Sequence, residues 1–215
     1  MASHTPPEFD RAFCDQLRDL FAWRRDVRRF RSEPLPDGLL EELLETACLS
    51  PSVGNSQPWR YVLVEDEARR KQVIADFEAC NADALASYDG EVAETYASLK
   101  LSGLRDAPVH LAVFVDRETP DGRGLGTRTM PETYDYSVVS AIQILWLAAR
   151  AHHVGLGWVS ILNPEIVCDI LDVPNTWRLV AYLCIGYPQE EHEDPELVRH
   201  GWQERRPLGD VLLKR

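Results

Sequence analysis

The chain has 215 residues, of which 45% are hydrophobic and 27% are charged, a composition typical of a soluble globular protein with a substantial core. Acidic residues outnumber basic residues by 35 to 23, which gives a formal net charge of −12. This balance argues against binding to nucleic acid or to an anionic membrane, because both require a dominant positive field. The five cysteines form no CxxC pair, and no secretory signal is visible. We therefore expect reduced thiols, no metal site and a cytoplasmic protein.

The predicted elements follow one another along the whole chain. In the first half they are a helix over residues 9–21, a helix over 39–48, a strand over 60–66, a mostly helical stretch over 67–99 broken near Asp89-Gly90, and a strand over 107–116. In the second half they are a flexible loop over 121–129, a buried helix over 134–151, a loop leading into a strand over 155–162, a helix capped by Asn163 and Pro164, and a strand over 177–188. The pattern predicts a single α+β domain over residues 1–215, with a central mixed or antiparallel sheet flanked by helices.

The common nucleotide and metal motifs are missing from the sequence. There is no GxGxxG after a strand, no GxxxxGK[ST] and no HExxH. Dinucleotide-fold, P-loop and zinc-protease interpretations are therefore unsupported.

An arginine-rich segment forms a local cluster of positive charge in this acidic chain. Residues 23–35 read WRRDVRRFRSEPL, with five arginines around Asp26. Such a cluster is usually a solvated surface, but it also suits a small anion such as a phosphate, which guanidinium groups bind bidentately. Downstream, the turn-rich stretch SPSVGNSQPW offers neutral donors and acceptors from Ser52, Asn55 and Gln57, although alone it would more often be only a turn.

Three separated stretches carry a family resemblance. RRDVRRF and ACLSPSVGNSQPWRYVLV resemble the nitroreductase-like flavoproteins, and TMPETYDYSVVSAIQILWLAARAHHVGLGWVSIL is similar to one branch of them, the 5,6-dimethylbenzimidazole synthases or flavin destructases. The resemblance implies a homodimer with two FMN sites at its interface and a C-terminal arm, about residues 189–215, exchanged between subunits. It implies that reduced FMN is fragmented with O2 to 5,6-dimethylbenzimidazole, the lower ligand of vitamin B12, and erythrose 4-phosphate. Electrons would come from NAD(P)H through a separate flavin reductase.

The resemblance also implies which residues meet the flavin. Arg24, Arg25 and Arg28 would hold the phosphate with Arg206 from the tail, while Ser52, Asn55 and Gln57 would hold ribityl hydroxyls and ring edges. Gly155 and Gly157 would let the backbone approach the ring, so that its N–H groups bond the N5/O4 edge. The implied binding set is Arg24, Arg25, Asp26, Val27, Arg28, Ser52, Asn55, Gln57, Gly157, Trp158, Val159, Ser160 and Arg206.

Asp26 and Ser160 are the residues that the family ties to the chemistry. We expect Asp26 to stay ionised beside its arginines and to act as acid or base, although a plain salt bridge would explain it equally well. Ser160 would position the flavin. Trp158 is expected near the ring, Tyr134 and Tyr136 either reach the site or cap a buried helix, and Arg29 and Arg31 form ion pairs. A lid is expected over residues 75–104, together with the 122–130 loop.

Two other functions stay open at this point. One is an NAD(P)H-dependent nitroreductase or flavin reductase on the same fold. The other is a non-catalytic protein that binds reduced flavin and releases it unchanged.

Overall fold

A computed structural model describes residues 6–99 and 103–215 of the chain. Its helices are α1 (Arg11–Trp23), α2 (Leu39–Ala47), α3 (Glu67–Ala86), α4 (Gly90–Ser98), α5 (Gly103–Asp106), α6 (Thr133–Ala151), α7 (Pro164–Leu171) and α8 (Glu196–Arg199). Its strands are β1 (Trp59–Leu63), β2 (Val109–Asp116), β3 (Gly155–Val159) and β4 (Trp177–Gly186). Three short 3₁₀ turns are η1 (Val53–Asn55), η2 (Asp121–Gly124) and η3 (Leu208–Asp210).

The four strands form one sheet in the order β1-β2-β4-β3, and each neighbouring pair runs antiparallel. A single parallel bridge, between Asp26 and Leu156, adds the segment after α1 to the β3 edge. The expected α+β fold is confirmed. Strand β3 begins at Gly155, so the loop expected at the start of residues 155–162 is wrong, and irregular chain follows the strand at Ser160.

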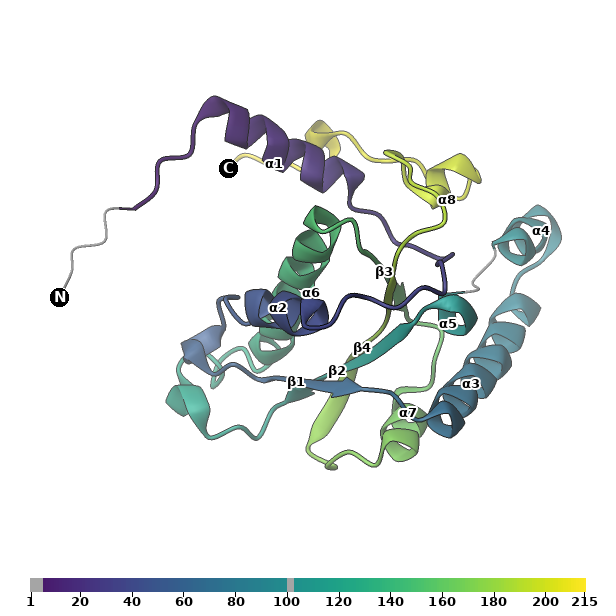
Figure 1. Cartoon of the computed structure of the whole chain (residues 1–215), viewed down its shortest axis with the longest axis horizontal. Coiled ribbons are helices and arrows are strands. Elements are labelled where there is room, and N and C mark those ends of the chain that lie inside the picture. Colours follow the sequence, from purple (N-terminus) through teal and green to yellow (C-terminus); the bar gives the residue numbers. More distant parts are fainter. Residues whose placement is uncertain (1–5, 100–102) are drawn as a thin grey trace.

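Helices cover both faces of the sheet (Figure 1), and the side chains of β2 alternate between them. Leu111, Val113 and Val115 belong to the core shared with α2 and α6, whereas Ala112 and Phe114 belong to the core shared with α3 and α7. All five are fully buried, which explains why β2 lacks the polar alternation of an edge strand. The central position predicted for this strand is confirmed.

Short polar side chains begin several of the helices. The carboxylate of Asp10 accepts from the Phe13 N–H at the start of α1, and Asp66 accepts from the first turn of α3. The predicted cap of α7 is also confirmed, because Asn163 accepts from the N–H groups of Glu165 and Ile166.

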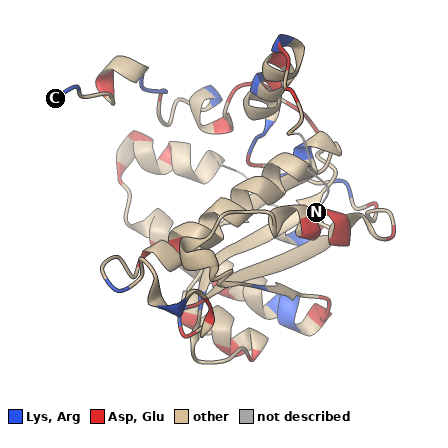
Figure 2. Cartoon of the chain, turned by 90° about the vertical axis from the view of Figure 1, so that its left-hand side faces the viewer, with Lys and Arg blue, Asp and Glu red and all other residues tan. Residues whose placement is uncertain are grey.

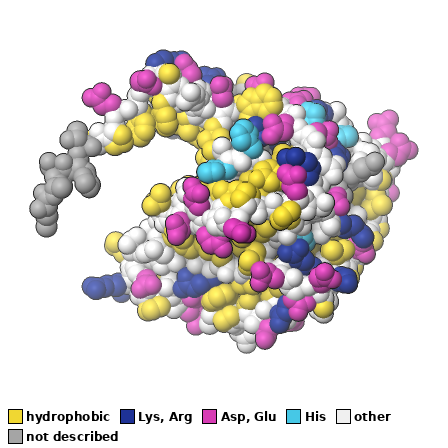
Figure 3. Space-filling view, in the orientation of Figure 1, with side chains coloured by type: hydrophobic (Ala, Val, Ile, Leu, Met, Phe, Trp, Pro, Cys, Tyr) yellow, Lys and Arg dark blue, Asp and Glu magenta, His cyan; other side chains and the backbone are white. Residues whose placement is uncertain are grey.

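Both ends of the chain extend beyond these layers. Helix α1, expected over 9–21 and observed over Arg11–Trp23, contributes no buried residue within the described part of the chain. Its large side chains Phe13, Phe21 and Trp23 are exposed, as is Phe9 just before the helix, and Figure 3 shows hydrophobic atoms along the side of this projecting arm that faces the body. The C-terminal end also projects from the body of the molecule (Figure 2). No helix in residues 6–99 and 103–215 is both long and apolar enough to cross a membrane.

Candidate functional site

The segment that carries Asp26 is fixed against the edge of the sheet. The Val27 N–H donates to the Leu156 carbonyl at 2.8 Å, and the Trp158 N–H donates to Oδ1 of Asp26 at 2.8 Å. The indole N–H of Trp146 donates to the Arg25 carbonyl at 3.2 Å. Backbone and side chain of this segment are therefore both held, and the Asp26 carboxylate has one defined position.

Two glycines of β3 make this close approach possible. A Cβ atom on Gly157 would lie 2.2 Å from the Val27 carbonyl oxygen, and one on Gly155 would lie 2.7 Å from Cγ2 of Val27. The space that we expected these glycines to leave for a ring is filled by Val27. The Trp158 N–H is likewise bonded to Asp26 and is not available for the N5/O4 edge of a flavin, in contrast to the sequence-based expectation.

Asp26 lies between two cavities of different character. The first, of about 50 Å³, is lined largely by charged side chains, both by arginines such as Arg24 and Arg25 and by acidic side chains of the tail. The second, of about 200 Å³, is lined largely by apolar and aromatic side chains, and also by Ser160. Asp26, Val27 and Arg28 line both cavities. A ligand with an anionic end and a flat apolar end would match this division, with Asp26 at the junction.

Opposing effects act on the ionisation of Asp26. Removal from bulk water raises the pKa of its carboxyl group, although 39% of the side-chain surface stays open toward the cavities. The hydrogen bond from Trp158 and the guanidinium of Arg28, whose Nε is 3.4 Å away, act in the opposite direction but do not outweigh this burial. The arginines therefore do not make Asp26 a simple, strongly acidic ion-pair partner.

Arg24 presents a cation whose hydrogen bonds are incomplete. Its guanidinium stacks 4.8 Å from the centre of the Trp146 ring, and its buried Nε has no hydrogen-bond partner among the described residues. Burial lowers the pKa of Arg24, the nearby charge of Asp26 raises it, and the positive charge of Arg205 lowers it. A buried donor without a partner among the described residues fits the phosphate of FMN.

The tail brings further arginines toward the arginine-rich segment. The positive charge of Arg205 lowers the pKa of both Arg24 and Arg25, and Arg205 and Arg25 line a third, more open cavity together. Arg205 and Arg206 are both exposed, and neither lines the two cavities beside Asp26 within the described part of the chain. The contact of Arg206 with a phosphate therefore stays a prediction, and Arg205 is a second candidate from the tail.

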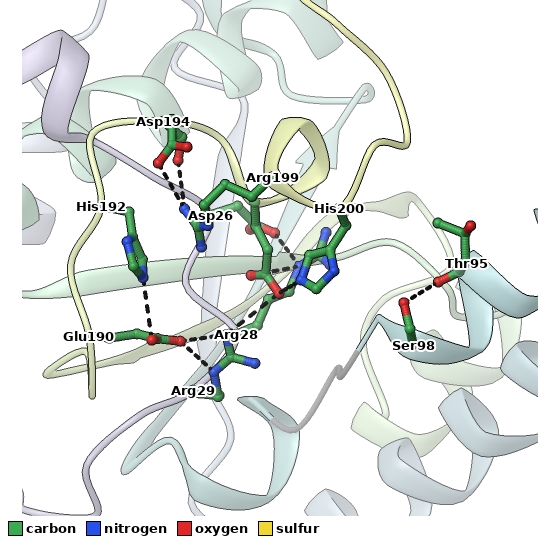
Figure 4. Close-up of polar contacts among 11 residues, drawn as sticks. Asp26, Arg28, Arg29, Thr95, Ser98, Glu190, His192, Asp194, Arg199 and His200 are labelled. Atoms are coloured by element: carbon green, nitrogen blue, oxygen red, sulfur yellow. Dashed lines mark hydrogen bonds and ion pairs between the residues drawn. The ribbon is translucent and has the colours of Figure 1, made fainter.

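Acidic residues of the tail pair with the arginine segment (Figure 4). Nε of Arg29 donates to Glu190 at 2.8 Å, and Glu196 lies 3.9 Å from Nε of Arg28. Nε of Arg25 donates to the Glu193 carbonyl at 2.8 Å. The sequence analysis missed these partners, although the acidic run EEHEDPE complements RRDVRR in charge.

The apolar cavity is covered from two directions. Phe77, Tyr96 and Leu104 line it from the stretch in which a lid was expected, and Leu197 and Trp202 line it from the tail. The Trp202 ring lies 5.8 Å from Tyr88 and 6.3 Å from Tyr96, measured between ring centres. The tail and α4 therefore close this cavity together, a role of Trp202 that the sequence did not indicate. Residues 100–102 of the expected lid lie outside the described residues.

The second polar stretch lies at the other edge of the sheet. Ser52, Asn55 and Gln57 surround η1, which precedes β1 and packs against η2 and α6, and they line neither cavity beside Asp26 within the described part of the chain. The 122–130 loop lies with them, since the Gly122 carbonyl oxygen approaches Gly54. Within one chain, these residues and Asp26 are at opposite edges and cannot hold one small ligand.

The remaining aromatic candidates differ in their surroundings. Tyr134 packs against that core and Tyr136 is exposed, and neither lines the cavities beside Asp26. Trp158 lines the apolar cavity, with its ring centre 6.3 Å from that of Trp146. In residues 6–99 and 103–215 there is no group of three or more His, Cys, Asp or Glu side chains that could hold a metal ion.

This antiparallel sheet between two helical layers, with an arginine-rich segment on its edge, defines a class of protein. The chain belongs to the nitroreductase family, whose sequence profile matches residues 21–187. It is 59% identical to 5,6-dimethylbenzimidazole synthase of Rhodospirillum rubrum, over 94% of this chain and 96% of that protein. It is 46% identical to a protein of the same name from Rhodobacter capsulatus, over 93% and 96% of the two chains.

A solved structure shares the fold as well. The crystal structure of oxidized iodotyrosine deiodinase bound to FMN and 3-iodo-L-tyrosine has a TM-score of 0.70 to this chain at 28% identity, covering 82% of this chain and 91% of that one. The resemblance drawn from three sequence motifs is therefore confirmed, both for the family and for its 5,6-dimethylbenzimidazole synthase branch.

Proposed function

We propose that this chain is a 5,6-dimethylbenzimidazole synthase, which makes the lower ligand of vitamin B12 by fragmenting reduced FMN with O2. The other product is erythrose 4-phosphate. The observation that carries the proposal is the position of Asp26, between a cavity lined by charged side chains and a cavity lined by apolar and aromatic side chains. The names of the relatives with 59% and 46% identity support the same reaction.

The charges of the site support a direction for the bound flavin. The phosphate would lie with Arg24, Arg25 and Arg205, where the buried Nε of Arg24 needs an acceptor. The flavin ring would lie in the apolar cavity, beside Val159 and Ser160. Arg28 lines both cavities and would reach the ribityl chain or the ring edge. Asp26 would then face the first carbons of the ribityl chain.

Each group of this chain would have a separate task. Bound reduced FMN supplies both the carbon skeleton and the electrons for O2. Asp26 would take the proton at the first ribityl carbon, for which its raised pKa suits a general base better than that of an ordinary aspartate. Ser160 would hold the ring edge through its hydroxyl, and the cover formed by α4 and Trp202 would exclude water.

The site would be completed by a second copy of the chain. Ser52, Asn55 and Gln57 lie at the sheet edge opposite Asp26, so they would reach a flavin held by the partner's arginines. The exposed aromatic side chains of α1 and the exposed Leu208, Leu212 and Leu213 of the tail would be covered in the same dimer. In this proposal residues 189–215 act as the dimer arm of a single domain, and a separate flavin reductase in the cytoplasm supplies reduced FMN.

One assay tests this function against its alternatives. The protein is mixed in air with FMN, NADH and a separate flavin reductase, and the flavin absorbance and products are followed. Permanent bleaching with formation of 5,6-dimethylbenzimidazole is expected. Without the added reductase, rapid oxidation of NADH and a flavin absorbance that recovers would instead identify a nitroreductase or flavin reductase. Full recovery with no NADH oxidation by the protein itself would identify a flavin-binding protein.

A further inference from the structure

We propose that Glu196 is a positioning residue for Asp26 and acts through Arg28, whose guanidinium lies between the two carboxylates. Glu196 comes from α8 in the tail, whereas Asp26 and Arg28 follow α1. The proposal rests on the function proposed above, in which Asp26 is the general base. It gives the acidic tail a part in the chemistry as well as in covering the site.

Arg28 lies within ion-pair distance of both carboxylates. Nε of Arg28 is 3.4 Å from Oδ2 of Asp26 and 3.9 Å from Oε2 of Glu196. The other oxygen of Glu196 is 3.6 Å from Nη2 of Arg29 and 3.7 Å from Nε2 of His200. Movement of Glu196 would therefore change how closely Arg28 pairs with Asp26.

The burial of Glu196 needs a reason other than stability. Its side chain is 11% exposed, and its Oε1 accepts no hydrogen bond from the described residues. Ion pairs that are buried without direct hydrogen bonds contribute little net stability, because desolvation offsets the Coulombic attraction. A charge kept in such a place is better explained by its effect on a neighbouring group.

The groups around Asp26 act on its protonation in opposite directions. Arg24 and Arg28 come from its own segment, the Trp158 N–H from β3, Cys184 from β4 and Glu196 from α8. Arg28 and the Trp158 N–H favour the ionised carboxylate, whereas burial and the like charge of Glu196 raise the pKa.

This balance matters for a general base. A base works best when its pKa lies near the working pH, so that it can both take and release a proton. Glu196 helps in two ways, because it repels the Asp26 charge and shares Arg28 with it. Without Glu196, Arg28 would no longer be shared with this second carboxylate and would pair more closely with Asp26, which would become a weaker base.

The test is an infrared titration of the full-length, FMN-free protein. The carbonyl stretch of protonated Asp26 is identified as the band that disappears in the Asp26→Asn variant. In Glu196→Gln, the midpoint of this titration is expected to move to lower pH. Glu196→Asp keeps the charge but withdraws it from Arg28 by one methylene group, so its midpoint should move in the same direction by less.

Glu190→Gln is the matched control, because Glu190 also carries one negative charge and pairs with Arg29 and His192. Its midpoint is expected to equal that of the wild type. An unchanged midpoint in Glu196→Gln, or an equal displacement in Glu190→Gln, would overturn the proposal. If circular dichroism shows that Glu196→Gln does not fold, the Glu196→Asp variant tests the proposal instead. An unchanged infrared midpoint in Glu196→Asp would then overturn the proposal.

The titration needs neither flavin nor turnover, so its failure is distinct from failure of the proposed function. In the complete assay, the acid limb of the pH–rate profile for Glu196→Gln should move to lower pH together with the infrared midpoint. If Glu196 served only to hold the tail, Glu196→Gln would lower the melting temperature but would leave the infrared midpoint and the acid limb of the pH–rate profile unchanged.

Discussion

The backbone N–H of Trp158 in β3 donates a hydrogen bond of 2.8 Å to the carboxylate of Asp26. This contact joins two stretches that are distant in the sequence, the arginine-rich segment and the GLGW strand. It also fixes the orientation of the residue on which the proposed chemistry depends. The close packing of Val27 on Gly157 makes the contact possible.

We predict that Gly157→Ala disrupts this edge of the sheet. The new Cβ would lie 2.2 Å from the Val27 carbonyl oxygen, so one backbone must move away from the other. We expect a loss of at least about 2 kcal/mol in the free energy of unfolding, together with weaker FMN binding. Gly209→Ala is the control, because among the described residues, apart from its two chain neighbours, no heavy atom lies within 4 Å of the position that its new methyl group would take. Equal stability of the two variants, measured by urea denaturation, would contradict the packing described here.

Arg24→Gln is predicted to weaken FMN binding. The Arg24 guanidinium is held over Trp146 with a buried Nε that lacks a partner among the described residues, and loss of a charged hydrogen bond to phosphate costs about 1.5–3 kcal/mol. The dissociation constant should therefore rise about 10- to 100-fold. Arg31→Gln, at an exposed arginine that pairs with Glu33 at 3.3 Å, should leave it unchanged. Calorimetric titration with FMN measures the dissociation constants of both variants. Equal dissociation constants would show that Arg24 does not bind the phosphate.

His110 is predicted to make the fold sensitive to acid. It is buried beside the Tyr182 hydroxyl, 3.0 Å from its Nδ1, and burial lowers its pKa from 6.5 to about 4. Because the folded state resists protonation, this stability is present above pH 6.5 and is lost as the pH falls through about 4, with a maximum of about 3 kcal/mol. His110→Gln should show a shallower loss of unfolding free energy between these limits. If the unfolding free energies of the wild type and of His110→Gln fell equally with decreasing pH, the neutral, buried state of His110 would be contradicted.

Asp26 is predicted to lower the stability of the flavin-free protein at neutral pH. Its pKa is raised in the folded state, so its favourable contribution is present in acid and is lost as the pH rises through the folded value. Asp26→Asn removes the charge and can still accept from the Trp158 N–H. The variant should melt at a higher temperature than the wild type at neutral pH, and the difference should shrink in acid. A variant that melts lower at every pH would contradict this environment.

Much of the fold could be predicted because its signals are local. The apolar run of β2, the long apolar helix α6 and the Asn163 cap are all confirmed at the predicted places. The site could be predicted only in part, because contacts across the chain decide it. Trp202 and Glu196 meet α4 and Arg28 only after the tail folds back, and no sequence spacing encodes that meeting. The sequence indicates that Gly155 and Gly157 allow a close approach, but it does not indicate that Val27 is the residue that approaches them.

The single-turnover reaction of Asp26→Asn tests the central claim most directly. Reduced FMN is bound to the wild type and the variant without oxygen, air is admitted, and 5,6-dimethylbenzimidazole and intact FMN are measured. We predict that the variant binds FMN nearly as well as the wild type but forms product at least about 100-fold more slowly, and that its flavin is recovered as FMN. Product formation at the wild-type rate would show that the carboxylate between the two cavities is not the base.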